Sequence, residues 1–127
     1  MRSPIGLKPL VGAIVATIVW SAAAMPPAEE ARALALFARI ESADGAVFIR
    51  NGREHNAAHA AEFLRRKCVP RFDRYADAAQ LVCDCAACSL TSGEIYRIRL
   101  AGETAARPSA EVRGEWLRAL PPPVAPR

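Results

Sequence analysis

Residues 47–68 read VFIRNGREHNAAHAAEFLRRKC, and this stretch sets the pattern for the rest of the chain. Its first three residues are strong strand formers and predict a strand over 46–50. Asn51-Gly52 follows and is typical of a type I′ turn, in which both residues have positive φ. We therefore expect the chain to return as a short second strand over 53–55.

A helix over residues 57–68 follows the predicted hairpin and is the clearest element of the sequence. Asn56 precedes it and is a good N-cap, because its side-chain oxygen can accept a hydrogen bond from the first turn. The basic run 65–67 suits the dipole at the last turn, and Pro70 blocks continuation. The apolar stripe of this helix consists of Ala57, Ala60, Ala61, Leu64 and Cys68.

The flanking sequence predicts three more helices and one more strand. Glu29 and Glu30 suit the first turn of a helix that should end near Ser42, because Asp44-Gly45 is a breaker. The other expected elements are a helix over 76–88, a strand over 94–100 and a last helix over 110–120 that Ser109 caps. The two faces of the strand hold Ile95, Arg97 and Arg99 on one side and Tyr96, Ile98 and Leu100 on the other.

The order of the expected elements, α-β-(β)-α-α-β-α, predicts a small single domain of the α+β class. Two or three short strands cannot bury their faces alone, so about four helices must cover them. We expect this domain to span residues 25–120. Residues 121–127 hold four prolines and are expected to form a disordered tail.

The first 24 residues have the three-part pattern of a secretory signal peptide. Arg2 and Lys8 supply positive charge, residues 10–20 are apolar, and residues 22–24 offer a small-residue cleavage site. The rival interpretation is an uncleaved anchor, but the apolar segment is shorter than the ~20 residues that a spanning helix needs. We therefore expect a periplasmic or secreted protein with no stable membrane span after cleavage of residues 1–24.

Charge gives weak information about partners, because the net charge of the chain is only +4. A nucleic-acid partner is not expected for a protein that leaves the cytoplasm. One basic cluster stands out, and it either meets anionic lipid headgroups or an acidic wall polymer or forms a solvated helix end. This cluster consists of Arg65, Arg66, Lys67, Arg71 and Arg74.

Short motifs in both halves of the chain resemble the YfeK-like family of small exported bacterial proteins, a domain of unknown function. The motifs are Phe48-Ile49-Arg50-Asn51-Gly52, His55 and residues 63–67 in the front half, and Ser89, Ser92-Gly93, Tyr96-Arg97 and Trp116-Leu117 in the back half. The resemblance covers about 29–120 and implies a fold outline without an activity. This chain departs from the family pattern in the second helix, where His59 and Phe63 replace an acid and a histidine.

Four cysteines, Cys68, Cys83, Cys85 and Cys88, predict one or two structural disulfides in an exported chain. Cys83 and Cys85 lie on opposite sides of a regular helix and cannot bridge each other. Cys85 and Cys88 share a face but would bridge only with strain. Cys68 can reach Cys83 or Cys85 if the connection 69–75 holds the two helices at an angle. The sequence leaves the pairing open.

The same thiols allow an alternative function in metal binding or disulfide exchange. Three soft ligands, which favour Cu(I) or Zn(II), lie close together at Cys83, Cys85 and Cys88, with Cys68, His55 and His59 as additional ligands. Their spacing differs from the paired C-x₂-C of a structural zinc site. Cys85-x-x-Cys88 is also a redox motif, although it lies late in its helix, where the dipole opposes a thiolate.

Two turns supply the candidate ligand site. If the turn at Asn51 meets the turn at Ser92, then Arg50, Asn51, His55, Ser92 and Tyr96 line one shallow pocket. An enzyme ranks last among the functions, since neither G-x-S-x-G nor H-E-x-x-H is present. We therefore expect a non-catalytic binding or accessory module of the cell envelope, stabilised by disulfides, with an unknown envelope partner and no cofactor.

Overall fold

The computed structural model describes residue 12 and residues 25–87 and 92–121. Almost all of the expected signal peptide, Cys88 and the end of the expected tail lie outside the described residues. The elements in chain order are α1 (Pro27–Glu41), β1 (Val47–Arg50), β2 (Arg53–His55), α2 (Ala57–Cys68), the 3₁₀ helix η1 (Val69–Arg74), α3 (Ala78–Leu81), the π-helix η2 (Val82–Ala86), β3 (Arg97–Arg99), β4 (Arg107–Pro108) and α4 (Ser109–Ala119). In this described part, every helix is too short or too polar to cross a membrane.

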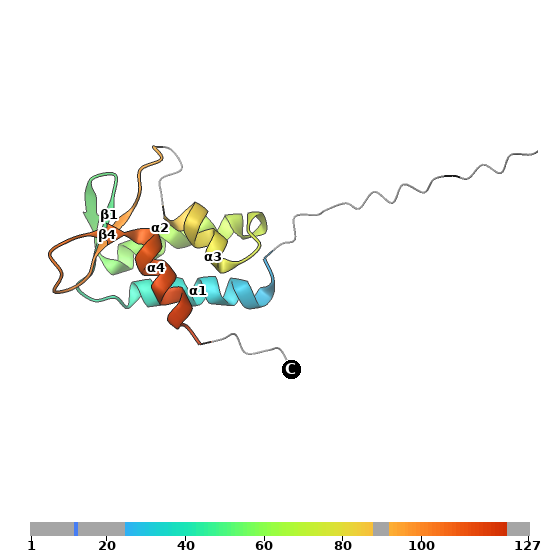
Figure 1. Cartoon of the computed structure of the whole chain (residues 1–127), viewed down its shortest axis with the longest axis horizontal. Helices are drawn as coiled ribbons and strands as arrows, with labels where there is room; N and C mark the ends of the chain where they lie inside the picture. The colour runs from blue at the N-terminus through green and yellow to red at the C-terminus, as the bar shows by residue number, and fades with distance from the viewer. Residues whose placement is uncertain (1–11, 13–24, 88–91, 122–127) are drawn as a thin grey trace, which may run out of the picture.

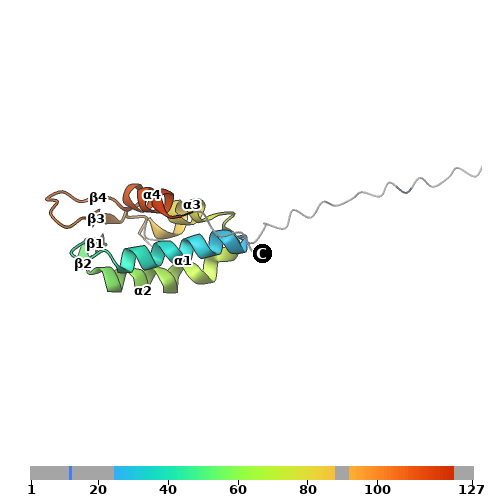
Figure 2. The same cartoon turned by 90° about the horizontal axis from the view of Figure 1, so that it is seen from below.

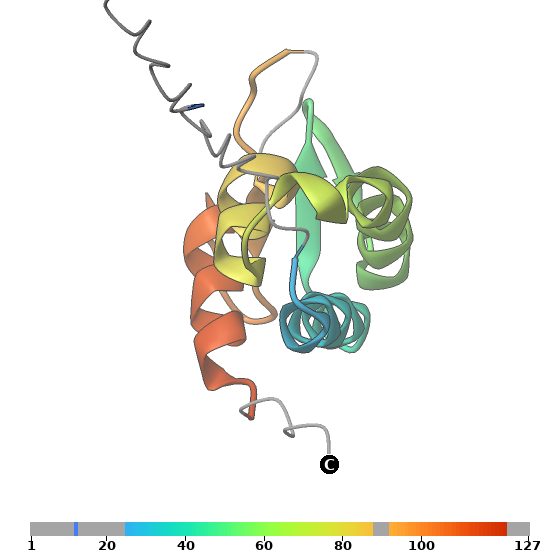
Figure 3. The same ribbon diagram turned by 90° about the vertical axis from the view of Figure 1, so that its right-hand side faces the viewer.

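The four strands form one antiparallel sheet in the order β2-β1-β3-β4. Phe48 in β1 pairs with His55 of β2 on one side and with Ile98 of β3 on the other. The sheet lies at one end of the molecule (Figure 1). The helices form two layers, one made of α1 and α2 and the other of α3 and α4 (Figure 2). Viewed along the long axis, α2 and α4 lie on opposite sides of β1 (Figure 3). The α+β class expected from the sequence is therefore confirmed.

The hairpin and the helix after it form as their local sequence predicts. Asn51 has φ 50° and Gly52 has φ 76°, so the turn between β1 and β2 has positive φ at both positions. The backbone N–H of His59 donates to the side-chain oxygen of Asn56 at 2.8 Å, which makes Asn56 the N-cap of α2. A stripe of apolar residues on α2, ending at Cys68, is buried. Helix α2 has the bounds predicted for it.

Strand β3 is shorter than expected, but its two faces are divided as predicted. Tyr96 and Ile98 are buried, whereas Ile95 is 54% exposed. The last strand, β4, was not predicted, because its two residues read as a loop and end in Pro108. Proline has no backbone N–H to donate, so it is tolerated here at the edge of the sheet.

Two expectations about helices are wrong in detail. The helix expected over 76–88 is a short α-helix, capped by the Asp77 side chain, that widens into the π-helix η2. Ser109 was expected to cap the last helix but is its first residue, with Pro108 at the N-cap position. Ser109 is fully buried instead, and its backbone N–H donates to the main-chain carbonyl of Tyr96 at 2.7 Å.

The hydrophobic core lies between the two helical layers and extends to the inner face of the sheet. Phe37 of α1 stacks on Phe72 of η1 with ring centres 6.5 Å apart. The guanidinium of Arg39 lies 4.3 Å from the centre of the Trp116 ring and joins α1 to α4 at the surface. Other core side chains with almost no exposure are Leu36, Ile40, Leu64, Leu81, Ile98 and Val112.

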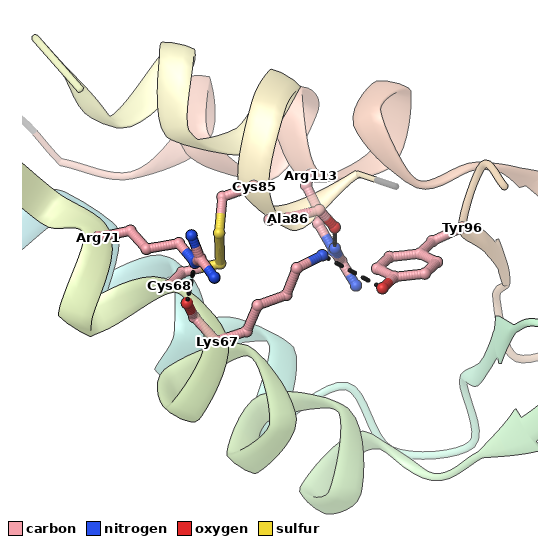
Figure 4. Close-up of a disulfide and its surroundings, with 7 residues drawn as sticks. All are labelled: Lys67, Cys68, Arg71, Cys85, Ala86, Tyr96 and Arg113. Atoms are coloured by element: carbon pink, nitrogen blue, oxygen red, sulfur yellow. Dashed lines mark hydrogen bonds between the residues drawn. A yellow bond between two sulfur atoms is a disulfide. The ribbon is translucent and has the colours of Figure 1, made fainter. Parts of the chain in front are cut away.

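A disulfide between Cys68 and Cys85 joins the end of α2 to η2 (Figure 4). The Cα atoms of the two residues are 6.0 Å apart, which is within the normal range for a disulfide. The connection over 69–75 forms η1 and turns the chain so that the two segments meet, as this pairing requires. The structure thus selects one of the pairings that the sequence left open.

Candidate functional site

A cavity of about 300 Å³ opens between the sheet and α2. Residues of β1, β2, α2 and α4 line it together with the chain around Tyr96. Its apolar walls include Phe48, Leu64 and Phe63, and the ring of Phe63 meets that of Tyr96 edge to face with centres 6.2 Å apart. The volume is at the lower end of the range for small-molecule pockets, ~300–1,000 Å³.

Arginine is the most frequent ionisable residue in the described lining of this cavity. Arg50, Arg66 and Arg97 contribute to its lining, and Glu62 is the one carboxylate among the described lining residues. The guanidinium of Arg50 lies 3.5 Å from the centre of the Phe63 ring, so it stacks on an aromatic wall of the cavity. An aromatic surface beside clustered guanidinium groups is suited to hold an anion that carries an apolar body.

His55 and His59 form a pair at one side of the cavity. The N-cap Asn56 stands between them in sequence, and the capped turn brings their rings to a centre-to-centre distance of 6.3 Å in a stacked arrangement. Burial lowers the pKa of His55, and the nearby charges of Arg50, His59 and Arg53 lower it further. The Nε2 atom of His55 is buried and has no hydrogen-bond partner among the described residues.

Arg113 is the buried cation of the site. It projects from α4, has only 3% of its surface exposed, and donates a hydrogen bond through Nη1 to the carbonyl oxygen of Ala86. That carbonyl ends η2, where helical carbonyls lack partners within the helix. The Nε atom of Arg113 has no partner, and no carboxylate within the described part of the chain pairs with this guanidinium. Burial lowers the pKa of Arg113 to about 9, although the nearby Tyr96 opposes the shift.

Tyr96, which lines the cavity, contacts Lys67 of α2, which does not. The Nζ atom of Lys67 donates to the hydroxyl oxygen of Tyr96 at 3.2 Å and lies 4.8 Å from the centre of the ring. Arg113 and Lys67 direct their charged ends toward the hydroxyl end of Tyr96, from α4 and α2 respectively (Figure 4). Two cations from different elements therefore converge on one hydroxyl group.

The structure places the five predicted site residues in two groups. Arg50, His55 and Tyr96 line the cavity. Asn51 and Ser92 do not line it, although their turns do meet, because the hydroxyl of Ser92 donates to the side-chain oxygen of Asn51 at 3.0 Å. These two residues join the turns beside the cavity, and ligand binding by any of the five remains a prediction.

The cysteines do not gather as one cluster of free thiols. Cys85 is bonded to Cys68, Cys83 is free and exposed, and Cys88 lies outside the described residues. In this oxidised form Cys85 has no thiolate to offer to a metal. Over residues 25–87 and 92–121 the structure shows no group of three His, Cys, Asp or Glu side chains placed to hold a metal ion.

Sequence reasoning missed several residues of the site, and Arg113 is the most important of them. A signal was available, because Arg113 falls on the buried stripe of α4 with Val112 and Leu117, where a charged residue is unexpected. His59 was expected at most as an additional metal ligand, and Phe63 as part of the family motif over 63–67, and neither was assigned to the ligand site. Their helical spacing of four residues places them on one face of α2, beside the cavity.

Fold and site together define a small α+β domain with a disulfide bridge between two helical segments and a cavity rich in cations. The chain belongs to a family of unknown function, DUF5329, whose model matches residues 27–120. Comparisons with curated proteins and with solved structures found no match. The family match covers the stretch that the sequence motifs indicated and confirms a domain of unknown function, whereas the likeness to YfeK-like proteins remains a prediction.

Proposed function

We propose that this protein is an exported, non-catalytic binding module of the cell envelope and that the cavity between the sheet and α2 holds its ligand. The observation that carries the proposal is the convergence of Arg50, His55 and Tyr96, three residues selected from sequence, on one cavity of about 300 Å³. Concave sites with apolar walls and a few polar groups are the usual form of small-molecule sites.

Two observations support the location in the envelope. The bond between Cys68 and Cys85 is of a kind that persists in oxidising compartments and is rare in the cytosol. The pattern of residues 1–24 is that of an export signal. The combination of a leader and a disulfide fits a domain that folds after export.

The composition of the cavity supports binding over catalysis. Four of the eight ionisable residues described in its lining are arginines, which remain charged at neutral pH and do not exchange protons in catalysis; the other four are His55, His59, Glu62 and Tyr96. The arginines are suited to hold and orient a ligand, and the stacking of Arg50 on Phe63 makes one of them part of the wall. The proposal therefore assigns the site to recognition.

The location is tested by fractionation of cells that express the chain with its native N-terminus. The protein is unfolded without reductant, alkylated and analysed by mass spectrometry. We expect a periplasmic or secreted product in which Cys68 and Cys85 resist alkylation until a reductant is added. A full-length cytosolic product with all cysteines alkylated would contradict the proposed location.

The ligand site is tested by ¹H–¹⁵N NMR spectra of the oxidised protein with a panel of envelope compounds that includes amino acids, muropeptides, sugars and fatty acids. We expect at least one class to shift the amide signals of Phe63 and Tyr96. Tyr96→Phe should weaken this response, whereas Asn51→Gly, which keeps the turn but lies outside the cavity lining, should leave it unchanged. A panel that shifts only signals remote from the cavity, or none, would contradict the proposed site.

The alternative function is thiol chemistry through Cys83, Cys85 and Cys88. It is favoured by one observation, the exposed free thiol of Cys83 two residues from the disulfide. Disulfide exchange requires an accessible thiolate that attacks a disulfide sulfur. If the purified protein contains copper or zinc and has three or more reduced thiols, metal binding would replace the binding module as the proposed function.

A further inference from the structure

Among the residues that the structure describes, the buried guanidinium of Arg113 has no carboxylate partner, which such a group normally has. Charged side chains are almost never fully buried unless they are paired, because removal of a charge from water is costly. Arg113 has five N–H donors. One of them donates to the carbonyl of Ala86, and Nε is buried with no hydrogen-bond partner within residues 25–87 and 92–121. An arginine in this state has donors available for a further acceptor.

Arg113 is part of the cavity lining together with Tyr96, although only 3% of its surface is exposed. Lys67 does not line the cavity, but its Nζ atom donates to the Tyr96 hydroxyl and places a second cation next to this lining residue (Figure 4). Three arginines besides Arg113 line the cavity, against the single described carboxylate of Glu62. The field inside the cavity is therefore positive and attracts an anion.

The walls of the cavity determine what kind of anion fits. Phe48 and Leu64 are buried in the wall, and Phe63 and Tyr96 meet edge to face. A fully hydrated inorganic anion would leave these apolar surfaces uncovered. A planar carboxylate matches the fork of a guanidinium, and an apolar body attached to it would cover the aromatic walls. The volume of about 300 Å³ restricts this body to a small one.

We propose that this protein binds a small organic acid, with the ligand carboxylate on the buried guanidinium of Arg113 and the apolar body against Phe63 and Tyr96. This proposal rests on the proposed function, since it names the chemical class of ligand for the same cavity. The ligand carboxylate supplies the counter-charge that Arg113 lacks, and the hydroxyl of Tyr96 lies beside it.

The test uses the oxidised mature protein with benzoate and hexanoate as probes, benzyl alcohol and hexanol as neutral analogues, and inorganic phosphate as a competing anion. Binding is measured by calorimetry and by the NMR signal of the Arg113 Nε–H group in the wild type. We expect both carboxylates to shift this signal. Their affinity should exceed that of the neutral analogues roughly tenfold or more, because a hydrogen bond between charged groups is stronger than one to a neutral hydroxyl. Phosphate should bind more weakly than benzoate.

The key variant is Arg113→Met, which retains an unbranched side chain about as long as the aliphatic part of arginine and removes the charge. The loss of the hydrogen bond to the buried Ala86 carbonyl should lower the melting temperature, and the removal of a buried charge should offset part of this loss, so the affinity is compared on protein that circular dichroism shows to be folded. Benzoate affinity should fall roughly tenfold or more. The matched control is Arg74→Gln, which removes one charge from an exposed position outside the cavity and should leave the affinity unchanged.

The possible failures are distinguishable. If the neutral analogues bind in the cavity as well as the acids, or if phosphate binds better than benzoate, the proposed function survives and the organic-acid proposal is wrong. If Arg113→Met loses stability and keeps full benzoate affinity, Arg113 serves only to hold Ala86. If neither acids nor neutral analogues shift signals of the cavity, this proposal is overturned, and the envelope panel decides separately whether the cavity has any ligand.

Discussion

The hydroxyl of Ser92 donates a hydrogen bond to the side-chain oxygen of Asn51 at 3.0 Å and thereby joins two turns that are 41 residues apart in sequence. The same Ser92 oxygen also accepts the backbone N–H of Glu94 at 3.3 Å. Asn51 itself has φ 50°, a left-handed conformation that asparagine adopts more readily than most residues. The contact therefore couples the geometry of the β1–β2 turn to the chain that leads into β3.

This contact predicts different costs for three substitutions. Asn51→Gly removes this hydrogen bond and should lower the free energy of unfolding by about 0.5–1.5 kcal/mol, and Ser92→Ala, which also loses the contact with the Glu94 N–H, should cost at least as much. Asn51→Ala also places an alanine at positive φ and should cost a further ~1 kcal/mol or more. Urea unfolding of the three variants measures these values. Equal stability of Asn51→Ala and Asn51→Gly would show that the left-handed turn places no demand on residue 51.

The disulfide should supply a large share of the stability of the domain. It closes a loop of 17 residues in sequence separation, for which chain-entropy arguments predict roughly 3 kcal/mol. Combined Cys68→Ala and Cys85→Ala replacement should therefore lower the melting temperature by roughly 12–24 °C, at about 4–8 °C per kcal/mol for a domain of this size. Thermal unfolding followed by circular dichroism measures the change.

The control for the disulfide is Cys83→Ser, because Cys83 is exposed and free. This variant should melt within a few degrees of the wild type, since exposed substitutions usually change stability by less than about 0.5 kcal/mol. A reductant should reproduce the loss seen in the double variant. If the reductant has no effect on the wild-type melting temperature, the bond between Cys68 and Cys85 does not stabilise the folded state.

Two glycines with positive φ form a matched pair for a further prediction. Gly45 has φ 77°, and a Cβ at this position would lie 3.0 Å from the Cβ of Ala101, whereas Gly102 has φ 82° and open space around it. Gly102→Ala should cost only the left-handed conformation, roughly 1–2 kcal/mol. Gly45→Ala should cost more, because the chain around Ala101 must also shift. Chemical denaturation of both variants tests the order, and equal losses would mean that the contact with Ala101 relaxes freely.

The parts of the fold that could be predicted from sequence are those with a local cause. Asn51-Gly52 specifies its own turn, and Asn56 starts α2 by binding the first free N–H groups of the helix. Strand β4 and the π-helix η2 have no such local signal. Pro108 enters the sheet only because β3 offers it an edge, and the chain widens at η2 where Cys85 meets Cys68.

The same distinction applies to the candidate site. Arg50, His55 and Tyr96 could be predicted because each lies beside a turn or on a strand whose position follows from local signals. Arg113 could not be placed, because its role depends on the carbonyl of Ala86, which lies 27 residues away on an element that sequence reasoning assigned to a regular helix. Long-range contacts of this kind need the tertiary structure.

The histidine pair predicts how stability depends on pH. His55 faces Arg50 on β1, Arg53 on β2 and His59 on α2, and burial with these charges lowers its pKa below the ordinary 6.5. The unfolded chain therefore binds more protons than the folded one as the pH falls through about 6.5. The contribution of a neutral His55 to stability is fully present above this pH and is lost below it.

We expect the free energy of unfolding of the wild type to decrease between pH 7.5 and pH 5.5, a window above the normal titration of carboxylates. His55→Gln cannot titrate at this position, so its stability should change less over the same window. Urea unfolding at several pH values gives both slopes. Because the prediction concerns the difference between the two slopes, titration of other groups common to both proteins cancels. If the wild type instead gains stability on acidification relative to His55→Gln, His55 is protonated more easily in the folded protein than in the unfolded chain. The surroundings of His55 would then be less positive than its neighbouring arginines indicate.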